Sequence, residues 1–127
     1  MTHQNPQSDA GAPEHLLDGT SLDFRYPSGG AIHMEISEGK LAYEWIAGPS
    51  KGSKAMGIPY RSRKFGDALY IVNWHEKDKP DFVTLIFDFR NHVVYSSALR
   101  RYQTDKEEIH FQAGIMQHVT RKKTGNQ

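Results

Sequence analysis

Apolar and polar residues alternate with a period of two along most of the chain, which is typical of half-buried β-strands. In residues 30–37, for example, Ile32, Met34 and Ile36 fall on one face. No segment of about ten or more residues has the 3.6-residue period of an amphipathic helix. The alternation predicts strands over residues 21–27, 30–37, 41–47, 69–76, 81–89, 93–99 and 108–120.

The segments between these strands are short and rich in turn-forming residues. Ser28-Gly29-Gly30 and Glu38-Gly39-Lys40 favour hairpin turns. Residues 49–66 are the least regular: residues 49–57 have the composition of a loop, and residues 59–65 allow another strand. Before the first strand, residues 13–17 could form one helical turn, with Pro13 near its start.

This arrangement predicts an all-β fold, because seven to nine short and locally connected strands form an antiparallel meander. Closing such a sheet into a single barrel removes its unpaired edges. A barrel of about eight strands has an interior that side chains fill or that holds one small ligand. We assign the barrel to residues 13–120, a disordered arm to residues 1–12 and a flexible basic tail to residues 121–127.

Size and charge exclude several functional classes. A chain of 127 residues with a net charge of +1 is expected to form one domain without the basic field of a nucleic-acid-binding protein. The absence of Cys excludes disulfides and thiolate chemistry and suits a reducing cytosol. No stretch resembles a membrane span or a signal peptide, so a cytoplasmic protein is expected.

The strand predicted over residues 69–76 decides what the interior contains. If Trp74 and Glu76 point inward, an indole and a carboxylate share the interior. If they point outward, Leu69 and Ile71 fill it instead. Both faces are half apolar, so alternation alone leaves the two arrangements open.

The order of these segments resembles the phenolic acid decarboxylases and the related MoaF-like domains, which are small calycin or lipocalin-type barrels. The pattern V-x-W-x-E at residues 72–76 carries the sharpest part of the resemblance. The remaining parts are GTSLDFRY at 19–26, Ser28-Gly29, Leu41-Ala42-Tyr43, ALYIVNWHE at 68–76 and FVTLIF at 82–87.

The resemblance implies site residues but leaves the decarboxylase motif incomplete. In that family a glutamate transfers a proton and two tyrosines with an arginine hold the substrate carboxylate. Glu76 matches the glutamate and Tyr26 the second tyrosine, while Phe24 replaces the first tyrosine and Ser53 falls at or near the arginine. A carboxylate entering an apolar barrel needs charge-assisted hydrogen bonds, so we discount decarboxylation.

Two lysines and one histidine extend this list of candidates. Lys51 or Lys54 could replace the missing arginine as a point charge. His33 could serve as a hydrogen-bond partner in the cavity, whereas a metal site built from His33, Glu35 and His110 has little support. No metal and no cofactor is therefore predicted. The predicted ligand-binding residues are Phe24, Tyr26, His33, Tyr43, Trp45, Trp74 and Glu76, with Glu76 and Tyr26 as the catalytic candidates.

Three functional hypotheses follow from these residues. The first is a MoaF-like barrel that binds a small aromatic or planar organic ligand. The second is a cofactor-independent lyase or isomerase in which Glu76 transfers a proton while Tyr26 and Tyr43 polarise a substrate oxygen. The third is a homodimeric accessory protein with a filled barrel and aromatic residues on its outer surface.

Overall fold

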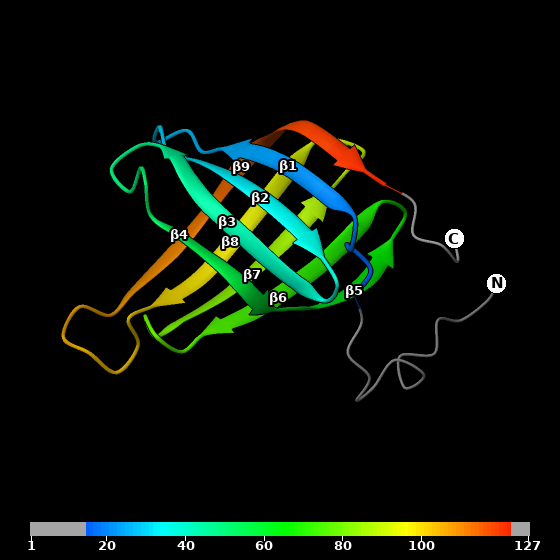
Figure 1. The fold of residues 1–127 in the computed structure, drawn as a ribbon. Coiled ribbons are helices and arrows are strands. Elements are labelled where there is room, and N and C mark those ends of the chain that lie inside the picture. The colour runs from blue at the N-terminus through cyan, green and yellow to red at the C-terminus, as the bar shows by residue number, and fades with distance from the viewer. Residues whose placement is uncertain (1–14, 123–127) are drawn as a thin grey trace.

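The computed structural model describes residues 15–122, and in them the chain forms one nine-stranded antiparallel sheet (Figure 1). The described residues contain no helix. The all-β fold predicted from the alternation is therefore confirmed. The strands are β1 (Thr20–Arg25), β2 (Ala31–Ser37), β3 (Lys40–Ala47), β4 (Lys54–Pro59), β5 (Arg61–Gly66), β6 (Leu69–Glu76), β7 (Asp81–Asp88), β8 (Val93–Arg100) and β9 (Glu108–Arg121).

The sheet curls into a half-barrel because its first and last strands pair with each other. The strand order is β4-β3-β2-β1-β9-β8-β7-β6-β5, so that every neighbouring pair except β1–β9 is also consecutive in the chain. The two edge strands, β4 and β5, meet at Tyr60, and β4 lies beside β6. Curling places inward apolar side chains of every strand except β5 around one core, and the buried residue of β5 is Ser62.

Two local predictions were wrong. Residues 54–57, taken as part of a loop, belong to β4, which is an edge strand with a register shift where Gly57 has a φ of +70°. A glycine and a bulge interrupt the alternation there. In place of the helical turn, Leu16–Gly19 form a hydrogen-bonded turn. The prediction of a disordered arm over residues 1–12 lies outside the described residues. So does that of a flexible tail over residues 121–127 from Lys123 onward, but Arg121 belongs to β9 and the Lys122 backbone N–H bonds Gly19.

The hairpin between β2 and β3 shows how the sequence sets the register. Glu38 and Gly39 both have positive φ values, +52° and +75°. Two such residues make a type I′ turn, whose twist matches that of the flanking strands. The turn places Ile36 opposite Leu41, and both are buried.

One end of the half-barrel is closed by the turn that precedes β1. Leu17 is completely buried there and packs in the core beside Tyr60. The Tyr60 hydroxyl accepts a hydrogen bond from the Leu17 backbone N–H at 3.2 Å and donates one to Asp18 at 2.8 Å. We call the turn at residues 16–19, together with Tyr60, the plug. Asp18 also accepts a hydrogen bond from the backbone N–H of Gly39, which ties the plug to the β2–β3 turn.

In residues 15–122 there is no helix long and apolar enough to cross a membrane.

Candidate functional site

Strand β6 turns its indole and its acid toward the enclosed space. Trp74 and Glu76 are only 6% and 8% exposed, whereas Ile71 and His75 on the other face of β6 are exposed. The inward face also places Val72 and Tyr70 against the core. Of the two arrangements that the alternation left open, the structure therefore has the one in which Trp74 and Glu76 point inward and the carboxylate is buried.

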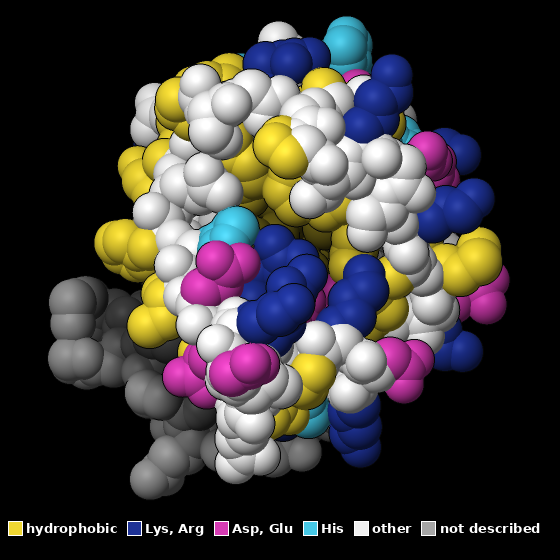
Figure 2. Space-filling model, turned by 90° about the vertical axis from the view of Figure 1, so that its left-hand side faces the viewer, with side chains coloured by type: hydrophobic (Ala, Val, Ile, Leu, Met, Phe, Trp, Pro, Cys, Tyr) yellow, Lys and Arg dark blue, Asp and Glu magenta, His cyan; other side chains and the backbone are white. Residues whose placement is uncertain are grey.

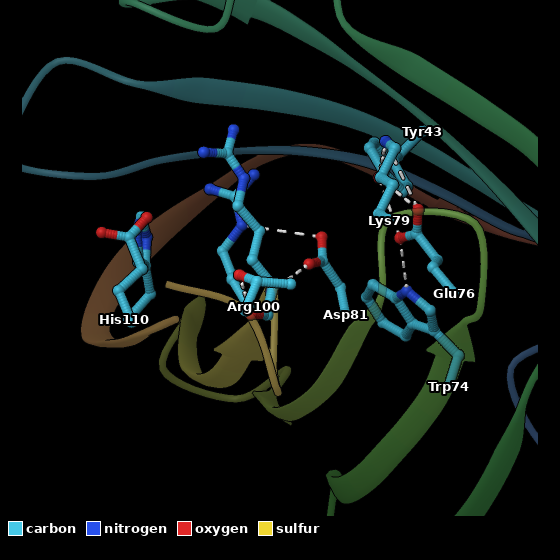
Figure 3. Close-up of polar contacts among 10 residues, drawn as sticks. Tyr43, Trp74, Glu76, Lys79, Asp81, Arg100 and His110 are labelled. Atoms are coloured by element: carbon cyan, nitrogen blue, oxygen red, sulfur yellow. Dashed lines mark hydrogen bonds and ion pairs between the residues drawn. The ribbon is translucent and has the colours of Figure 1, made fainter. Parts of the chain in front are cut away.

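Three side chains hold the Glu76 carboxylate (Figure 3). The Tyr43 hydroxyl donates to it, lying 2.8 and 2.9 Å from its two oxygens, and the Trp74 indole N–H donates to Oε1 at 2.9 Å. The Lys79 ammonium lies 3.3 Å from Oε2 and also donates to the Tyr43 hydroxyl at 2.9 Å. The desolvation of this carboxylate is therefore offset by neutral donors and by one cation.

The phenol of Tyr43 is fixed as a proton donor in this network. Burial raises the pKa of Tyr43 far above its usual value, and the hydrogen bond to Glu76 and the negative charge of Glu76 raise it further. Tyr43 thus keeps its proton at neutral pH. Its single O–H is directed at Glu76 rather than into the cavity.

A second buried carboxylate, Asp81, lies directly across from Glu76 because these two residues pair between β6 and β7. Asp81 accepts a hydrogen bond from the backbone N–H of Arg101 at 2.9 Å. The Arg100 Nε lies 3.6 Å from the other oxygen of Asp81 (Figure 3). Among the described residues, this ion pair is the only polar contact of the Arg100 side chain.

Aromatic rings form the opposite wall. The rings of Phe24 and Tyr26 meet edge to face with their centroids 5.6 Å apart, and Trp45 lies 6.3 Å from Tyr26. Burial raises the pKa of the Tyr26 phenol, although a hydrogen bond with Ser96 partly opposes this shift. Tyr26 therefore presents a neutral hydroxyl inside an aromatic surface.

These two walls enclose a cavity of about 60 Å³ at the end of the half-barrel opposite the plug. Figure 2 shows this end as a hollow with hydrophobic side chains inside and Lys and Arg at its edge. The cavity is lined by Phe24, Tyr26, Ile32, Met34, Tyr43, Trp45, Trp74, Glu76, Asp81, Val83, Leu85, Ser96, Ala98, Arg100, His110 and Gln112. This lining combines a mostly apolar wall with a few polar groups, as small-molecule sites do.

Of the seven residues predicted to bind a ligand, His33 is the one that the cavity does not contain. It lies on the outer face of β2, where its ring nitrogens bond Asp23 at 2.6 Å and Glu35 at 2.9 Å. The hydrogen bond to Glu35, followed by that to Asp23, raises the pKa of His33. Partial burial acts in the opposite direction but is outweighed. Placing His33 in the cavity was wrong because Ile32 and Met34 already occupy the inward positions of β2.

The other basic and metal-binding candidates do not come together at the cavity. His110 lines the cavity but pairs with Glu108, and His33 and Glu35 are on the outer face. Residues 15–122 contain no group of three side chains suited to hold a metal ion. Lys51 and Lys54 are exposed and do not line the cavity, so neither replaces the missing arginine there.

Sequence reasoning missed several residues that line the cavity. Ser96 and Arg100 follow the inward positions Val94 and Ala98 along β8, so alternation could have found them. His110 and Gln112 could not be found in this way, because β9 turns its polar residues inward.

The fold and this cavity define a small half-barrel of the kind found in calycin-like proteins. A family model for MoaF-like proteins matches residues 18–115, and the chain belongs to this MoaF-like family. A solved structure with a similar fold is that of a Burkholderia vietnamiensis protein described as "a putative beta-lactamase". It has a TM-score of 0.69 and 18% identity over 91% of this chain and 98% of that chain. A search of curated proteins finds no match.

Proposed function

We propose that this protein binds a small planar organic molecule that bears a carbonyl or carboxylate oxygen, at the open end of the half-barrel. The ring would lie against the aromatic wall of Phe24, Tyr26 and Trp45. The oxygen would accept hydrogen bonds from the Tyr26 hydroxyl or from the Arg100 guanidinium. One observation supports the proposal above all: these rings share the cavity with Arg100, and among the described residues the Arg100 side chain has one polar partner, Asp81.

The size of the cavity sets a condition for binding. Its volume of about 60 Å³ is well below the ~150 Å³ of an apolar cavity that accepts benzene. A ring can therefore enter only if side chains at the open end move outward. Arg100 and His110 are the side chains best able to do so, since each is held by one ion pair and is partly exposed.

Tryptophan fluorescence offers a direct test because both tryptophans of the chain, Trp45 and Trp74, line the cavity. We expect saturable changes on titration with benzoate and with benzamide, with dissociation constants near the millimolar range for such small ligands. Tyr26→Phe should weaken the binding of both compounds, whereas Arg100→Gln should weaken that of benzoate more. Circular dichroism would check that each variant is folded.

Two controls make this result specific. Met56→Ala changes an exposed apolar side chain on β4 that does not line the cavity, and it should leave both titrations unchanged. Cyclohexanecarboxylate has the same charge as benzoate but no planar ring, and it should bind more weakly. The absence of a saturable change with both ring compounds would refute the proposal, as would equal binding of cyclohexanecarboxylate.

The alternative function is a lyase or isomerase that uses Glu76 as general acid or base together with Tyr26 and Tyr43. One observation favours it: a buried carboxylate lines the cavity and is bonded to a tyrosine and a lysine that could pass protons. Against it, both oxygens of Glu76 already accept hydrogen bonds, and the O–H of Tyr43 is one of the donors. We therefore favour binding over catalysis.

The variant Glu76→Gln separates these two functions. If the protein is a lyase, this change should abolish turnover and leave ligand affinity nearly intact. Hydroxycinnamic acids are the substrates to try first, and we expect no decarboxylated product, because Phe24 and Ser53 stand where the decarboxylases have a tyrosine and an arginine. Turnover that is lost in Glu76→Gln would support the alternative, and turnover that persists would remove Glu76 from any mechanism.

A further inference from the structure

The first half of β9 has its hydrophobic pattern turned outward. Ile109 and Phe111 are 71% and 84% exposed, while His110 and Gln112 between and after them line the cavity. Farther along, Ile115 is 55% exposed. A strand with one solvent-exposed face normally places its apolar residues on the other, buried face. The pattern of β9 indicates that its outer face is covered as well.

The two neighbouring strands extend this apolar surface. Phe111 pairs with Ser97 of β8, and Ile109 pairs with Leu99, which in turn pairs with Phe82 of β7. We call this surface the β7–β9 outer face. It consists of Phe82, Thr84, Ile86, Val93, Tyr95, Ser97, Leu99, Ile109, Phe111, Ala113 and Ile115, none of which is buried or charged. The face ends at Asp88, the charged outward residue of β7 that pairs with Val93.

The outer face of the other half of the sheet is different. On β2 and β3 the outward positions include His33, Glu35, Lys40 and Glu44. Charged residues of this kind keep a sheet face in water. The contrast between the two halves shows that the lack of charge on the β7–β9 outer face is particular to that face.

The area of this face is what a stable dimer needs. Its five most exposed large side chains present roughly 600 Å², if each has ~200 Å² in all, which is the upper limit for the largest apolar patch of a monomer. They are Phe82, Tyr95, Ile109, Phe111 and Ile115. The partly exposed residues between them bring the face toward the ~800 Å² that each partner buries in a standard interface.

The composition of the terminal segments argues against them as the occupant of this face. Residues 1–14 and 123–127 contain no aromatic and no branched aliphatic side chain. A charged partner finds no complementary charge on the face, and an anionic membrane surface finds no Lys or Arg there. A second copy of the same face requires neither, because a two-fold axis sets each apolar row against the same row of the partner.

We propose that two copies of this chain associate through their β7–β9 outer faces into a two-fold symmetric dimer. The contact would bury Phe111 and Ile109, the two most exposed large side chains of the face. The inner sides of the same strands carry Arg100 and His110, so the dimer would also hold the strands that form one side of the cavity.

Sedimentation velocity of the full chain over a range of concentrations tests this proposal. We expect a species of twice the 14.5 kDa chain mass. Phe111→Asp should weaken dimerisation by roughly 30-fold or more, as expected when a charge replaces a large aromatic side chain that the contact buries. Met56→Asp is the matched control, because Met56 is 82% exposed but lies on β4, outside the face. It should dimerise like the unmodified chain.

A second readout locates the contact independently of any loss of association. The chain has no Cys, so a single spin label can be placed at Ser97→Cys within the face or at Glu44→Cys on β3. Dipolar coupling between copies should be strong for the label at 97 and weak or absent at 44. A chain that is monomeric at all concentrations would overturn the proposal, even if it binds vesicles or another protein. So would a Phe111→Asp dimer as stable as that of the unmodified chain.

Discussion

Two tyrosine–carboxylate pairs, one at each end of the half-barrel, use the same chemistry in different surroundings. At the closed end Tyr60 donates to Asp18 at 2.8 Å, and at the open end Tyr43 donates to Glu76 at 2.8 Å. In both pairs burial, the hydrogen bond and the carboxylate charge raise the tyrosine pKa far above its usual value. Neither hydroxyl ionises near neutral pH.

The two pairs differ in what lies beside them. Tyr60 is almost completely buried, it accepts from the Leu17 backbone, and Leu17 fills the space next to it. Tyr43 is only partly buried, and beside it lie Lys79 and the cavity. A tyrosine–carboxylate pair is therefore no mark of a functional site by itself. What distinguishes the open end is the cavity beside the pair and the nearby Arg100 guanidinium, which has one polar partner among the described residues, Asp81.

The largest effect is expected from removing each ring. Tyr60→Ala should lower the free energy of unfolding by ~3–5 kcal/mol, because it leaves a large cavity in the plug. Tyr43→Ala should cost about half as much, since its ring already borders open space. Urea denaturation followed by circular dichroism measures both. Equal costs would show that the two ends are packed alike and would contradict the comparison.

Removing only the hydroxyl groups should lower the free energy of unfolding by less, and the loss should again be larger at Tyr60 than at Tyr43. Tyr60→Phe leaves the backbone N–H of Leu17 without its acceptor in a buried place, at a cost of ~1–3 kcal/mol. Tyr43→Phe should cost ~0.5–1.5 kcal/mol, because Glu76 keeps its bonds to Trp74 and Lys79. The denaturation midpoints of the two variants provide the measurement. A larger loss in Tyr43→Phe would mean that the Glu76 network, and not the plug, is the main polar support of the fold.

The smallest effect is expected for His33 on the outer side of β2, in the pH dependence of the free energy of unfolding. This site lies away from both tyrosine pairs and serves as a control for them. The raised pKa of His33 implies that the protonated form stabilises the fold. This contribution is present in full below the unfolded value of about 6.5 and is lost as pH rises through the folded value. Because His33 is partly exposed, the change should stay below ~1 kcal/mol.

His33→Gln tests this sign. Unfolding midpoints at pH 6 and pH 8.5 should differ less in the variant than in the unmodified chain, which should be relatively more stable at pH 6. The hydroxyl groups of Tyr43 and Tyr60 have pKa values raised far above the usual value, so they keep their protons over this pH range and should not contribute. If the unmodified chain instead gains stability relative to the variant as pH rises, the assigned role of His33 is wrong.

The sequence predicted the strands well where one face is apolar and the other polar. The bounds of β6 were correct to the residue, and those of β2, β3, β7, β8 and β9 to within one residue. β4 was missed because Met56 is exposed, Gly57 takes a positive φ and Pro59 ends the strand. An edge strand with these features has no alternation to detect.

The candidate site was predictable in part for a similar reason. Alternation along β1 and β3 places Phe24 and Tyr43 inward, and the family resemblance added Trp74 and Glu76. The orientation of β6 was not predictable because both of its faces are half apolar. Nor was the inward turn of His110, because it leaves the apolar Ile109 and Phe111 on the exposed face, against the usual alternation.

Chemical-shift mapping of the ¹⁵N-labelled protein with benzoate tests the central claim most directly, since it reports on both ends of the half-barrel at once. We predict saturable shifts of the indole N–H signals of Trp45 and Trp74 and of the backbone signal of Arg100. The signals of Leu17 and Gly39 at the plug should not move. Shifts confined to the plug or to the β7–β9 outer face, or no shifts at all, would contradict a ligand site at the open end.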